Sequence, residues 1–531
     1  MPSATCVWDP WENKILPEGT SKSGAEPASA DNLGQRSAVA FGWGVFASIA
    51  KILMTIVVQA VLARLLGPTE FGLYALGMLV MGVATFFADV GLATSLVQKS
   101  EITASDIRFV FTLNLCTAGG VALLVASCAD LLAAAFDKPE TAPIFRALAP
   151  VFVLNAVASV STSLLRRRLD YRTIQLAGLV AYFVGFGIVG IAVAGVVGSV
   201  YALVIAYLVQ SAIALCLLYA KTRHVVGLSF AGDARRSHLS FGGMVLVTNL
   251  VNWLVDAMDR VVVGKLFSAA SLGHYSAAYN LIYAPVGALY PNLQSTVFSS
   301  TARLQSEPER MRHAYLELLN AVTAIFIPLF VGVFFFAPKL VLAIYGPNWL
   351  AAARIAEAFC LMAPFLLVWG ISTPILWNTG RRSTEVKVQL PFIVLAALAI
   401  VVAAGNSLLA VAWVTAGVFV IRTLLMVVLA CRSLHIGCAT AARCIFPAVW
   451  ITTLVGLAAM ACAHALGAIG STNVVSLLLG GTVIGVSALA CFMAVPGSLP
   501  LTVRRFAGRR SRQGGPAWIR GVLNRLSHGA S

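Results

Sequence analysis

Charged residues are scarce in this chain of 531 residues: they make up 11% of the sequence, whereas hydrophobic residues make up 59%. A soluble domain carries about 25% charged residues, so the composition excludes a soluble protein and indicates many membrane spans. Acidic residues are the scarcer sign, 21 against 37 lysines and arginines. The basic residues fall in short loops and in the C-terminal tail, as membrane topology requires, which argues against nucleic acid as a partner.

Motifs of catalysis and of nucleotide binding are missing as well. The chain has no P-loop, no HExxH, no GxSxG and no Cys/His cluster with metal-ligand spacing. Most of its ten cysteines, such as Cys116 and Cys491, lie inside apolar runs and suggest small core residues. We therefore expect no catalytic residue, no metal and no cofactor, and the protein is not predicted to be an enzyme.

Apolar runs predict fourteen transmembrane helices, each near the roughly 20 residues that cross a bilayer. Eighteen lysines and arginines lie in loops on the side of the termini, against six in the opposite loops and adjoining helix ends. The positive-inside rule therefore predicts that both termini are cytoplasmic. The expected spans are 38–63, 71–96, 108–134, 145–165, 174–195, 197–220, 239–264, 272–300, 314–337, 350–378, 388–404, 407–430, 441–463 and 474–495.

A repeat divides most of the chain into two halves. The segment ARLLGPTEFGLYA, which begins at residue 63, aligns with GKLFSAASLGHYS, 201 residues later. This offset pairs Arg64 with Lys265 and Gly72 with Gly273. Repeated halves around a site at the membrane midplane are typical of transporters.

The predicted fold class is all-α: a polytopic membrane protein of about 14 transmembrane helices, with two pseudo-symmetric six-helix lobes and two C-terminal helices. The chain opens with polar residues and no apolar core segment, so we expect no cleavable signal peptide. The expected regions are a disordered cytosolic tail (1–36), an N-lobe of helices 1–6 (37–222), a C-lobe of helices 7–12 (223–431), helices 13–14 (432–500) and a basic cytosolic tail (501–531).

A polar stripe runs along expected helix seven. Asn249, Asn252, Asp256 and Asp259 are spaced by three, four and three residues and share one helical face, with Arg260 alongside. Polar groups at membrane depth are costly unless they face protein or water. We interpret the stripe as the lining of an internal cavity. The alternative is contact between helices, with Asp256 or Asp259 paired to a neighbouring helix.

The repeat places a second stripe, Lys51, Thr55 and Gln59, on expected helix one. Lys51 lies about thirteen residues into that helix, roughly 20 Å at the helical rise, which is too deep for its amine to reach the membrane surface easily. Arg422 lies in the middle of expected helix twelve. For Lys51 and Arg422 the alternative is an ion pair with a buried aspartate. The cavity candidates are Lys51, Gln59, Asn252, Asp256, Asp259, Arg260 and Arg422, and the carboxylates available to couple an ion are Asp89, Asp256 and Asp259.

Expected helix eight carries Tyr275, Tyr279 and Tyr283, spaced by four. Aromatic faces with polar tips suit sugar rings, so these tyrosines are candidates for sugar contact. Core packing or an interface belt is the alternative.

Two stretches carry a family resemblance. The run RLLGPTEFGLYALGMLVMGVATFFADVGLATSLVQK at 64–99 resembles the opening of bacterial polysaccharide flippases, and DRVVVGKLFSAASLGHYSAAYNL at 259–281 resembles the start of their second half. These proteins form the polysaccharide transporter family of the multidrug/oligosaccharidyl-lipid/polysaccharide (MOP) superfamily. The branch most similar is the Wzx-type one that exports colanic acid and succinoglycan-type polymers. The resemblance extends over roughly 37–430.

The resemblance implies two lobes arranged as a V around a central cavity. It implies translocation of an undecaprenyl-pyrophosphate-linked oligosaccharide repeat unit across the bacterial inner membrane for exopolysaccharide synthesis, by alternating access of the lobes. Lys51, Arg260 and Arg422 are then candidates to offset the pyrophosphate charge, and the uncharged spans 441–463 and 474–495 are candidates for a lipid-tail groove. The implied partners are the lipid-linked substrate, the membrane, and a polysaccharide polymerase with its export machinery.

Two other functions remain as alternatives. A multidrug or cation antiporter of the same superfamily would use the buried carboxylates Asp89, Asp256 and Asp259 and would not need cations in its cavity. A membrane polymerase or ligase would bear a large outer loop with catalytic residues, and the expected outer loops are short.

Overall fold

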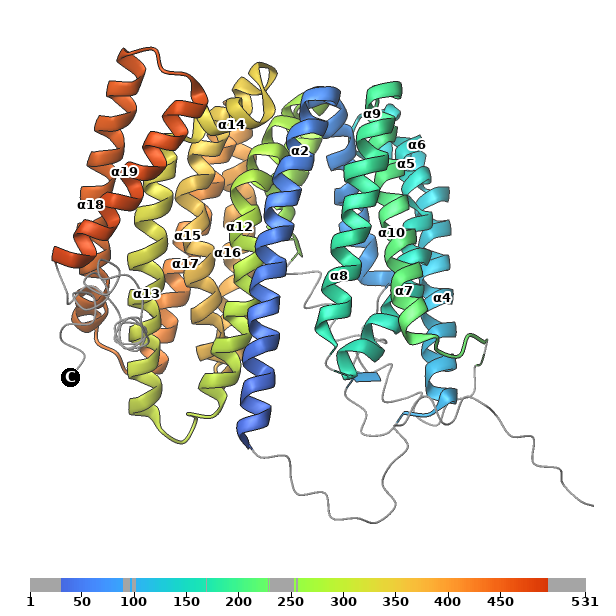
Figure 1. Cartoon of the computed structure of the whole chain (residues 1–531), viewed down its shortest axis with the longest axis horizontal. Helices are drawn as coiled ribbons and strands as arrows, with labels where there is room; N and C mark the ends of the chain where they lie inside the picture. Colours follow the sequence, from blue (N-terminus) through green and yellow to red (C-terminus); the bar gives the residue numbers. More distant parts are fainter. Residues whose placement is uncertain are drawn as a thin grey trace, which may run out of the picture.

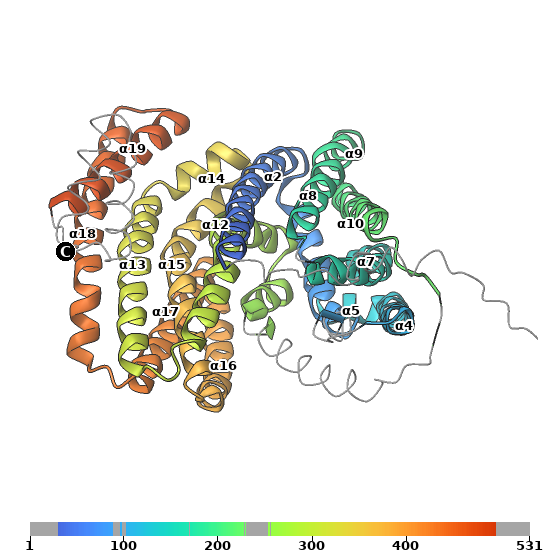
Figure 2. The same cartoon turned by 60° about the horizontal axis from the view of Figure 1, so that its bottom comes forward.

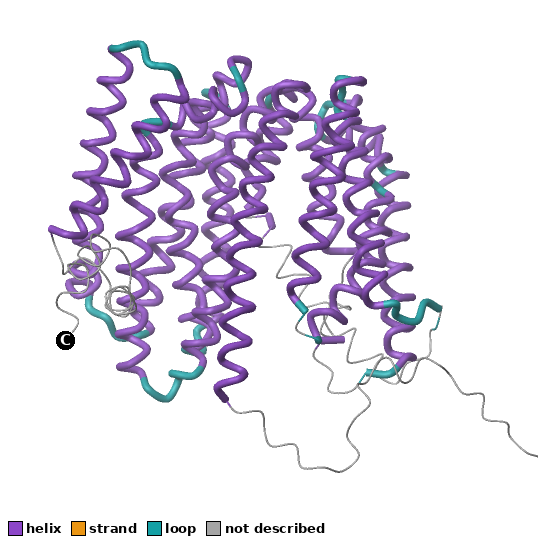
Figure 3. Tube along the Cα trace, viewed as in Figure 1, coloured by secondary structure: helices purple, strands orange, loops and turns teal. Residues whose placement is uncertain are grey.

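The computed structural model describes residues 30–88, 96–97, 102–168, 170–227, 229, 253–254 and 256–494. Within these ranges the chain consists of helices and connecting loops, with no strand (Figure 3). The predicted all-α fold is therefore confirmed. Most of the expected N-terminal tail and all of the expected C-terminal tail lie outside the described residues, as do Asp89, Asn249 and Asn252.

Two bundles of helices stand side by side, with α2 between them (Figures 1 and 2). The first bundle contains α2 (Ala30–Ala88), whose first part packs on η2, α9 and α10, together with α4 (Ala104–Ser127), α5 (Ala129–Ala135), η1 (Pro139–Thr141), α6 (Ala142–Leu148), α7 (Pro150–Arg167), α8 (Tyr171–Tyr182), the π-helical η2 (Phe183–Gly190), α9 (Ile191–Val197) and α10 (Tyr201–Thr222). The second contains α12 (Ala269–Ala302), α13 (Pro308–Phe334), α14 (Ala337–Tyr345), η3 (Pro347–Trp349), α15 (Leu350–Asn378), α16 (Arg382–Ala404) and α17 (Leu408–Ser433). We call these bundles the N-lobe and the C-lobe.

Two further helices, α18 (Cys438–Ala468) and α19 (Asn473–Ala494), flank the C-lobe on the side away from the N-lobe (Figure 1). They pack on each other and on α13 through an apolar cluster that includes Ile451, Val455 and Ile484. A polar tie joins α14 to α19, where Lys339 Nζ donates to Ser476 Oγ at 2.8 Å. The appended pair is thus attached to one lobe only.

Among the described residues, eleven segments are long and apolar enough to span a membrane. Three differences separate this number from the fourteen expected spans. Expected spans one and two fall within the single helix α2, most of span seven lies outside the described residues, and α12 is too rich in polar residues to qualify. The count of fourteen stays a prediction.

Helix α2 departs from expectation at its start and in its middle. It begins at Ala30, ahead of the expected first span, so the helix continues beyond the apolar run, and the disorder of the tail 1–36 stays a prediction. Inside it, Gly67 adopts φ +74° and Pro68 follows. Proline lacks an N–H and disfavours helical geometry in the residue before it, so one helix ends at Gly67 and another starts at Pro68. The repeat partner of this restart, α12, begins instead with Ser268, whose Oγ accepts a hydrogen bond from Ser271 N.

The two lobes meet where these restarted helices cross. A Cβ atom built on Gly72 would lie 1.7 Å from the backbone oxygen of Ala269, and one built on Gly273 would lie 1.9 Å from that of Pro68. Both the glycines and their partners are 201 residues apart in sequence. The contact is therefore reciprocal: each half supplies the same two positions to it. We call this crossing, with the polar contacts around it, the lobe junction.

Backbone oxygens at the ends of the preceding helices are used symmetrically in the lobe junction. The oxygen of Ala63 accepts from Trp349 Nε1 at 3.1 Å, and the oxygen of Gly264 accepts from Lys138 Nζ at 2.7 Å. Each donor comes from the opposite lobe. Burial lowers the pKa of Lys138, because a charged amine is less favourable away from water.

The next residue of each half reaches across the lobe junction as well. Arg64 donates through Nε to the oxygen of Ile344 at 3.0 Å and through Nη2 to that of Ala343, at the C-terminal end of α14. A cation is favourable there because helix carbonyls leave partial negative charge at that end. Lys265 Nζ pairs with Asp137 Oδ2 at 2.6 Å. The lobe junction thus holds the lobes together at the end where α14, α5 and α6 lie (top of Figure 1).

Candidate substrate site

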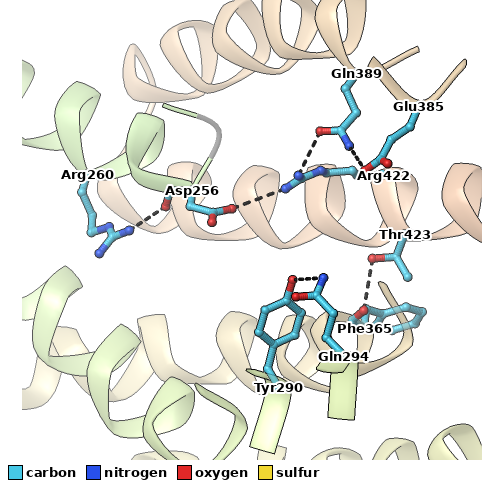
Figure 4. Close-up of polar contacts among 9 residues, drawn as sticks. All are labelled: Asp256, Arg260, Tyr290, Gln294, Phe365, Glu385, Gln389, Arg422 and Thr423. Atoms are coloured by element: carbon cyan, nitrogen blue, oxygen red, sulfur yellow. Dashed lines mark hydrogen bonds and ion pairs between the residues drawn. The ribbon is translucent and has the colours of Figure 1, made fainter. Parts of the chain in front are cut away.

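Arg422 is a buried cation in the middle of α17, with 3% of its side chain exposed. Its Nη2 donates to Gln389 Oε1 on α16 at 3.1 Å, and its Nη1 lies 3.4 Å from Asp256 Oδ1 (Figure 4). The guanidinium carbon lies 4.5 Å from the centre of the Trp369 ring on α15. A buried charge is costly unless it is paired and hydrogen-bonded, so several helices have to supply contacts for this one arginine. Arg422 thus pairs with Asp256, one of the aspartates that the ion-pair alternative allows, and this aspartate is half exposed rather than buried.

The network continues from Gln389 towards the start of α16. Gln389 Nε2 donates to Glu385 Oε1 at 2.8 Å, and Trp377 Nε1 donates to Glu385 Oε2 at 2.6 Å. Both Glu385 and Gln389 are buried. The chain Glu385–Gln389–Arg422–Asp256 therefore alternates acceptor and donor across the C-lobe (Figure 4).

Sequence reasoning missed Glu385 and Gln389. The expected span 388–404 places Glu385 before the helix and Gln389 at its first turn, where neither residue stands out. The available signal was their spacing of four, which places an acid and an amide on one helical face. Nothing in the sequence pairs that face with Arg422, which lies 33 residues later.

Asp259 and Arg260 form a second part of the site, one helical turn from Asp256. Tyr275 donates its hydroxyl hydrogen to Asp259 Oδ2 at 2.8 Å, and Arg260 Nε lies 3.7 Å from Asp259 Oδ1. Arg260 Nη2 donates to the backbone oxygen of Asp256 at 2.6 Å, and its guanidinium lies 4.5 Å from the centre of the Tyr279 ring. Asp259 is thus a buried, fully used structural acid. In the described part of the chain, no three His, Cys, Asp or Glu side chains gather as metal ligands would.

The three tyrosines that were candidates for sugar contact differ in exposure. Tyr275 is completely buried, and its hydroxyl is committed to Asp259. Tyr279 is buried beneath Arg260 and stacks on Tyr283 with ring centres 5.0 Å apart. Tyr283 alone of the three is only half-buried. The sugar role stays a prediction, and in this conformation Tyr283 is the one of the three tyrosines whose side chain is partly exposed.

The N-lobe candidates do not touch this network. Lys51 is exposed on α2, and its described surroundings include no ion pair with Asp256 or Asp259. Gln59 is half-buried, two turns further along the same helix. Asp89 and Asn252 lie outside the described residues. Contacts among the described residues therefore join Asp256, Asp259, Arg260 and Arg422, and none of these contacts includes Lys51.

Comparison with known proteins gives consistent relatives. The profile of a family described as "Polysaccharide biosynthesis protein" matches residues 61–354, more than half of the chain. The lipopolysaccharide biosynthesis protein WzxC of Escherichia coli (strain K12) is 24% identical over 335 residues, which cover 63% of this chain and 67% of WzxC. The succinoglycan biosynthesis transport protein ExoT of Rhizobium meliloti (strain 1021) is also 24% identical over 335 residues, which cover 63% of this chain and 66% of ExoT.

A solved structure shares the architecture. The lipid II flippase MurJ, in an inward closed conformation, superimposes with a TM-score of 0.62 at 14% identity, over 86% of this chain and 99% of MurJ. A likeness at this identity shows the fold alone, and that fold agrees with the expected all-α membrane architecture. The sequence match decides the family: this chain belongs to the polysaccharide biosynthesis protein family, as its residues 64–99 and 259–281 predicted.

Proposed function

We propose that this protein translocates an undecaprenyl-pyrophosphate-linked oligosaccharide repeat unit across the bacterial inner membrane, for the synthesis of an exopolysaccharide or surface polysaccharide. Family membership and the names of ExoT, a transport protein, and MurJ, a lipid II flippase, support this proposal. The observation that carries it is Arg422, a cation buried in a membrane-depth helix and paired with an aspartate that is half exposed.

The chemistry of such a head group fits this site. A pyrophosphate carries negative charge that must be offset away from bulk water, and a guanidinium does this with paired N–H donors. The Arg260 guanidinium is held one helical turn away, and Lys51 on α2 offers a further positive charge. The polyprenyl chain remains in the lipid, so only the sugars and phosphates need a polar path.

Alternating access requires the lobe junction to break and re-form. It joins the lobes through Arg64, Lys138, Lys265 and Trp349, and each of these side chains reaches into the opposite lobe. We place both termini in the cytoplasm on the charge of the loops, so the lobe junction lies at the outer face. The translocated unit would then pass to a polysaccharide polymerase and its export machinery.

A cation antiporter is the second candidate function. It would need free carboxylates to bind a cation, and here Asp259 is bonded to Tyr275 while Asp256 faces Arg422. These pairings favour an anionic cargo over a cationic one.

Deletion of the gene tests the proposal. We expect surface polysaccharide to disappear while its lipid-linked repeat unit accumulates, and wild-type protein to restore export. Arg422→Ala should fail to restore it, Arg422→Lys should restore it in part, and Arg354→Ala should restore it fully, because Arg354 is exposed on α15 and pairs with Glu357 of its own helix. Removing one partner of a buried ion pair costs roughly 3–5 kcal/mol, so membrane abundance is measured alongside. Normal polysaccharide with new drug sensitivity would establish the antiporter instead.

A further inference from the structure

Asp256 differs from the other charged residues of the site in its exposure. Its side chain is 47% exposed, whereas that of Arg422 is 3% and that of Arg260 is 22% exposed. It lies between the two arginines, with its carboxylate towards Arg422 and its backbone oxygen bound by Arg260 (Figure 4). The accessible side of this cluster is therefore occupied by an anion.

The contact between Asp256 and Arg422 is incomplete. At 3.4 Å it is longer than the about 2.7–2.9 Å of a good charge-assisted hydrogen bond, and one carboxylate oxygen makes it. The Nε atoms of both Arg260 and Arg422 are buried without a hydrogen-bond partner in the described part of the chain. The two guanidinium groups thus retain donors that a single carboxylate does not use.

Arg422 does not depend on Asp256 alone for its position. Gln389 binds it from α16, Glu385 fixes Gln389, and Trp369 and Phe419 lie against the guanidinium. The cation would therefore stay in place if the carboxylate of Asp256 moved away.

We propose that Asp256 is an internal stand-in for the substrate's diphosphate: its carboxylate occupies the anion position at Arg422 in the empty protein, and the diphosphate displaces it. This inference rests on the proposed function. It assigns Asp256 the control of affinity, because the carboxylate competes with the head group for Arg422 and repels it once both are present. A transporter needs such a limit, since a head group bound too tightly is not released on the other side.

Binding of inorganic pyrophosphate to the purified full-length protein in detergent tests this competition. Asp256→Asn removes the competing charge at almost constant size, and should tighten pyrophosphate binding about two- to fivefold, the effect of losing a partly exposed ion pair. Arg422→Gln should abolish binding in both backgrounds. Asp130→Asn is the control: it removes a carboxylate that pairs with Arg146 on the exposed surface of the N-lobe, outside the site, and should leave pyrophosphate binding unchanged.

A second experiment compares the free diphosphate with the lipid-linked one. Undecaprenyl pyrophosphate in nanodiscs should show the same ordering of variants as the inorganic ion, and Asp256→Asn should slow polymer export despite tighter binding. If Asp256→Asn does not fold, Asp256→Ser provides the uncharged side chain.

The outcomes are distinguishable. Equal or weaker binding by the uncharged variants, with wild-type protein binding pyrophosphate, would overturn the role of Asp256 and leave the proposed function standing. If no variant binds either diphosphate, both the stand-in and the pyrophosphate role of Arg422 are wrong.

Discussion

Replacing Gly273 by alanine should weaken the lobe junction. The added Cβ would lie 1.9 Å from the oxygen of Pro68 and 3.0 Å from the nitrogen of Gly72, whereas Cβ atoms essentially never approach another heavy atom within 3.0 Å. The two helices must therefore separate by about 1 Å, the difference between 3.0 and 1.9 Å. The obstructing atoms are backbone and cannot rotate aside, so the cost lies near the upper end of the usual overpacking range, about 3 kcal/mol.

This cost should destabilise only the conformation in which the lobe junction is closed. If the lobe junction opens during transport, the open state has room for the extra methyl group, and about 3 kcal/mol shifts the balance between the two states about a hundredfold. The variant should remain folded and abundant but lose most of its polymer export. A cysteine placed at Ala63, which is buried in the lobe junction, should become reactive to a membrane-impermeant thiol reagent applied from the outer side.

Two controls make this test decisive. Gly417→Ala changes a glycine in α17 with no atom within 4 Å of the new Cβ, so it should leave export and labelling unchanged. The double variant Gly72→Ala/Gly273→Ala should cost much less than the sum of its parts, because both methyl groups meet the same contact. Export and labelling equal to wild type in Gly273→Ala would refute the close crossing. Loss of folded protein without new labelling would make the lobe junction a permanent contact.

Two further predictions concern the first helix and the topology. Lys51→Ala should lose most polymer export at normal abundance, Lys51→Arg should retain much of it and Lys51→Glu should abolish it, because the exposed amine is expected to offset the head-group charge; normal export by Lys51→Ala would remove this residue from the site. Reporters that work only in the periplasm should be inactive when fused to either terminus, and activity at one end would contradict the proposed orientation.

The membrane explains why the fold class was predictable. Backbone polar groups in a bilayer must bond within their own segment, so long apolar runs become helices whatever surrounds them. Hydropathy does not determine where each helix begins and ends. Helix α2 extends to Ala30, beyond the apolar run, and α12 crosses the C-lobe with too many polar residues to register as a span by hydropathy. Tertiary packing, which the sequence window does not contain, holds α12 against α15 and α2.

From the sequence, the site was predictable only where its residues lie on the same helix. The three-and-four spacing placed Asp256 and Asp259 on one face, but it did not distinguish their roles. Asp259 is bonded to Tyr275 of the next helix, whereas Asp256 faces Arg422, 166 residues later. The spacing makes Tyr275 a candidate both for sugar contact and for core packing, because spacing shows a face and not the partner of that face. Such partners are set by which helices the fold makes neighbours.

The repeat is preserved unevenly, and the pattern is informative. At the lobe junction the halves keep the same chemistry: Arg64 and Lys265 are both cations, and glycine recurs at 72 and 273. The polar stripes differ, because the same offset places Thr55 over Asp256. A junction that must part and close benefits from two equivalent halves, since both lobes move about one axis. Binding a head group with phosphates at one end and sugars at the other does not benefit from equivalent halves, since the two ends need different partners. The reciprocal glycine crossing at the junction and the asymmetric charge in the stripes therefore both suit a flippase of such a cargo.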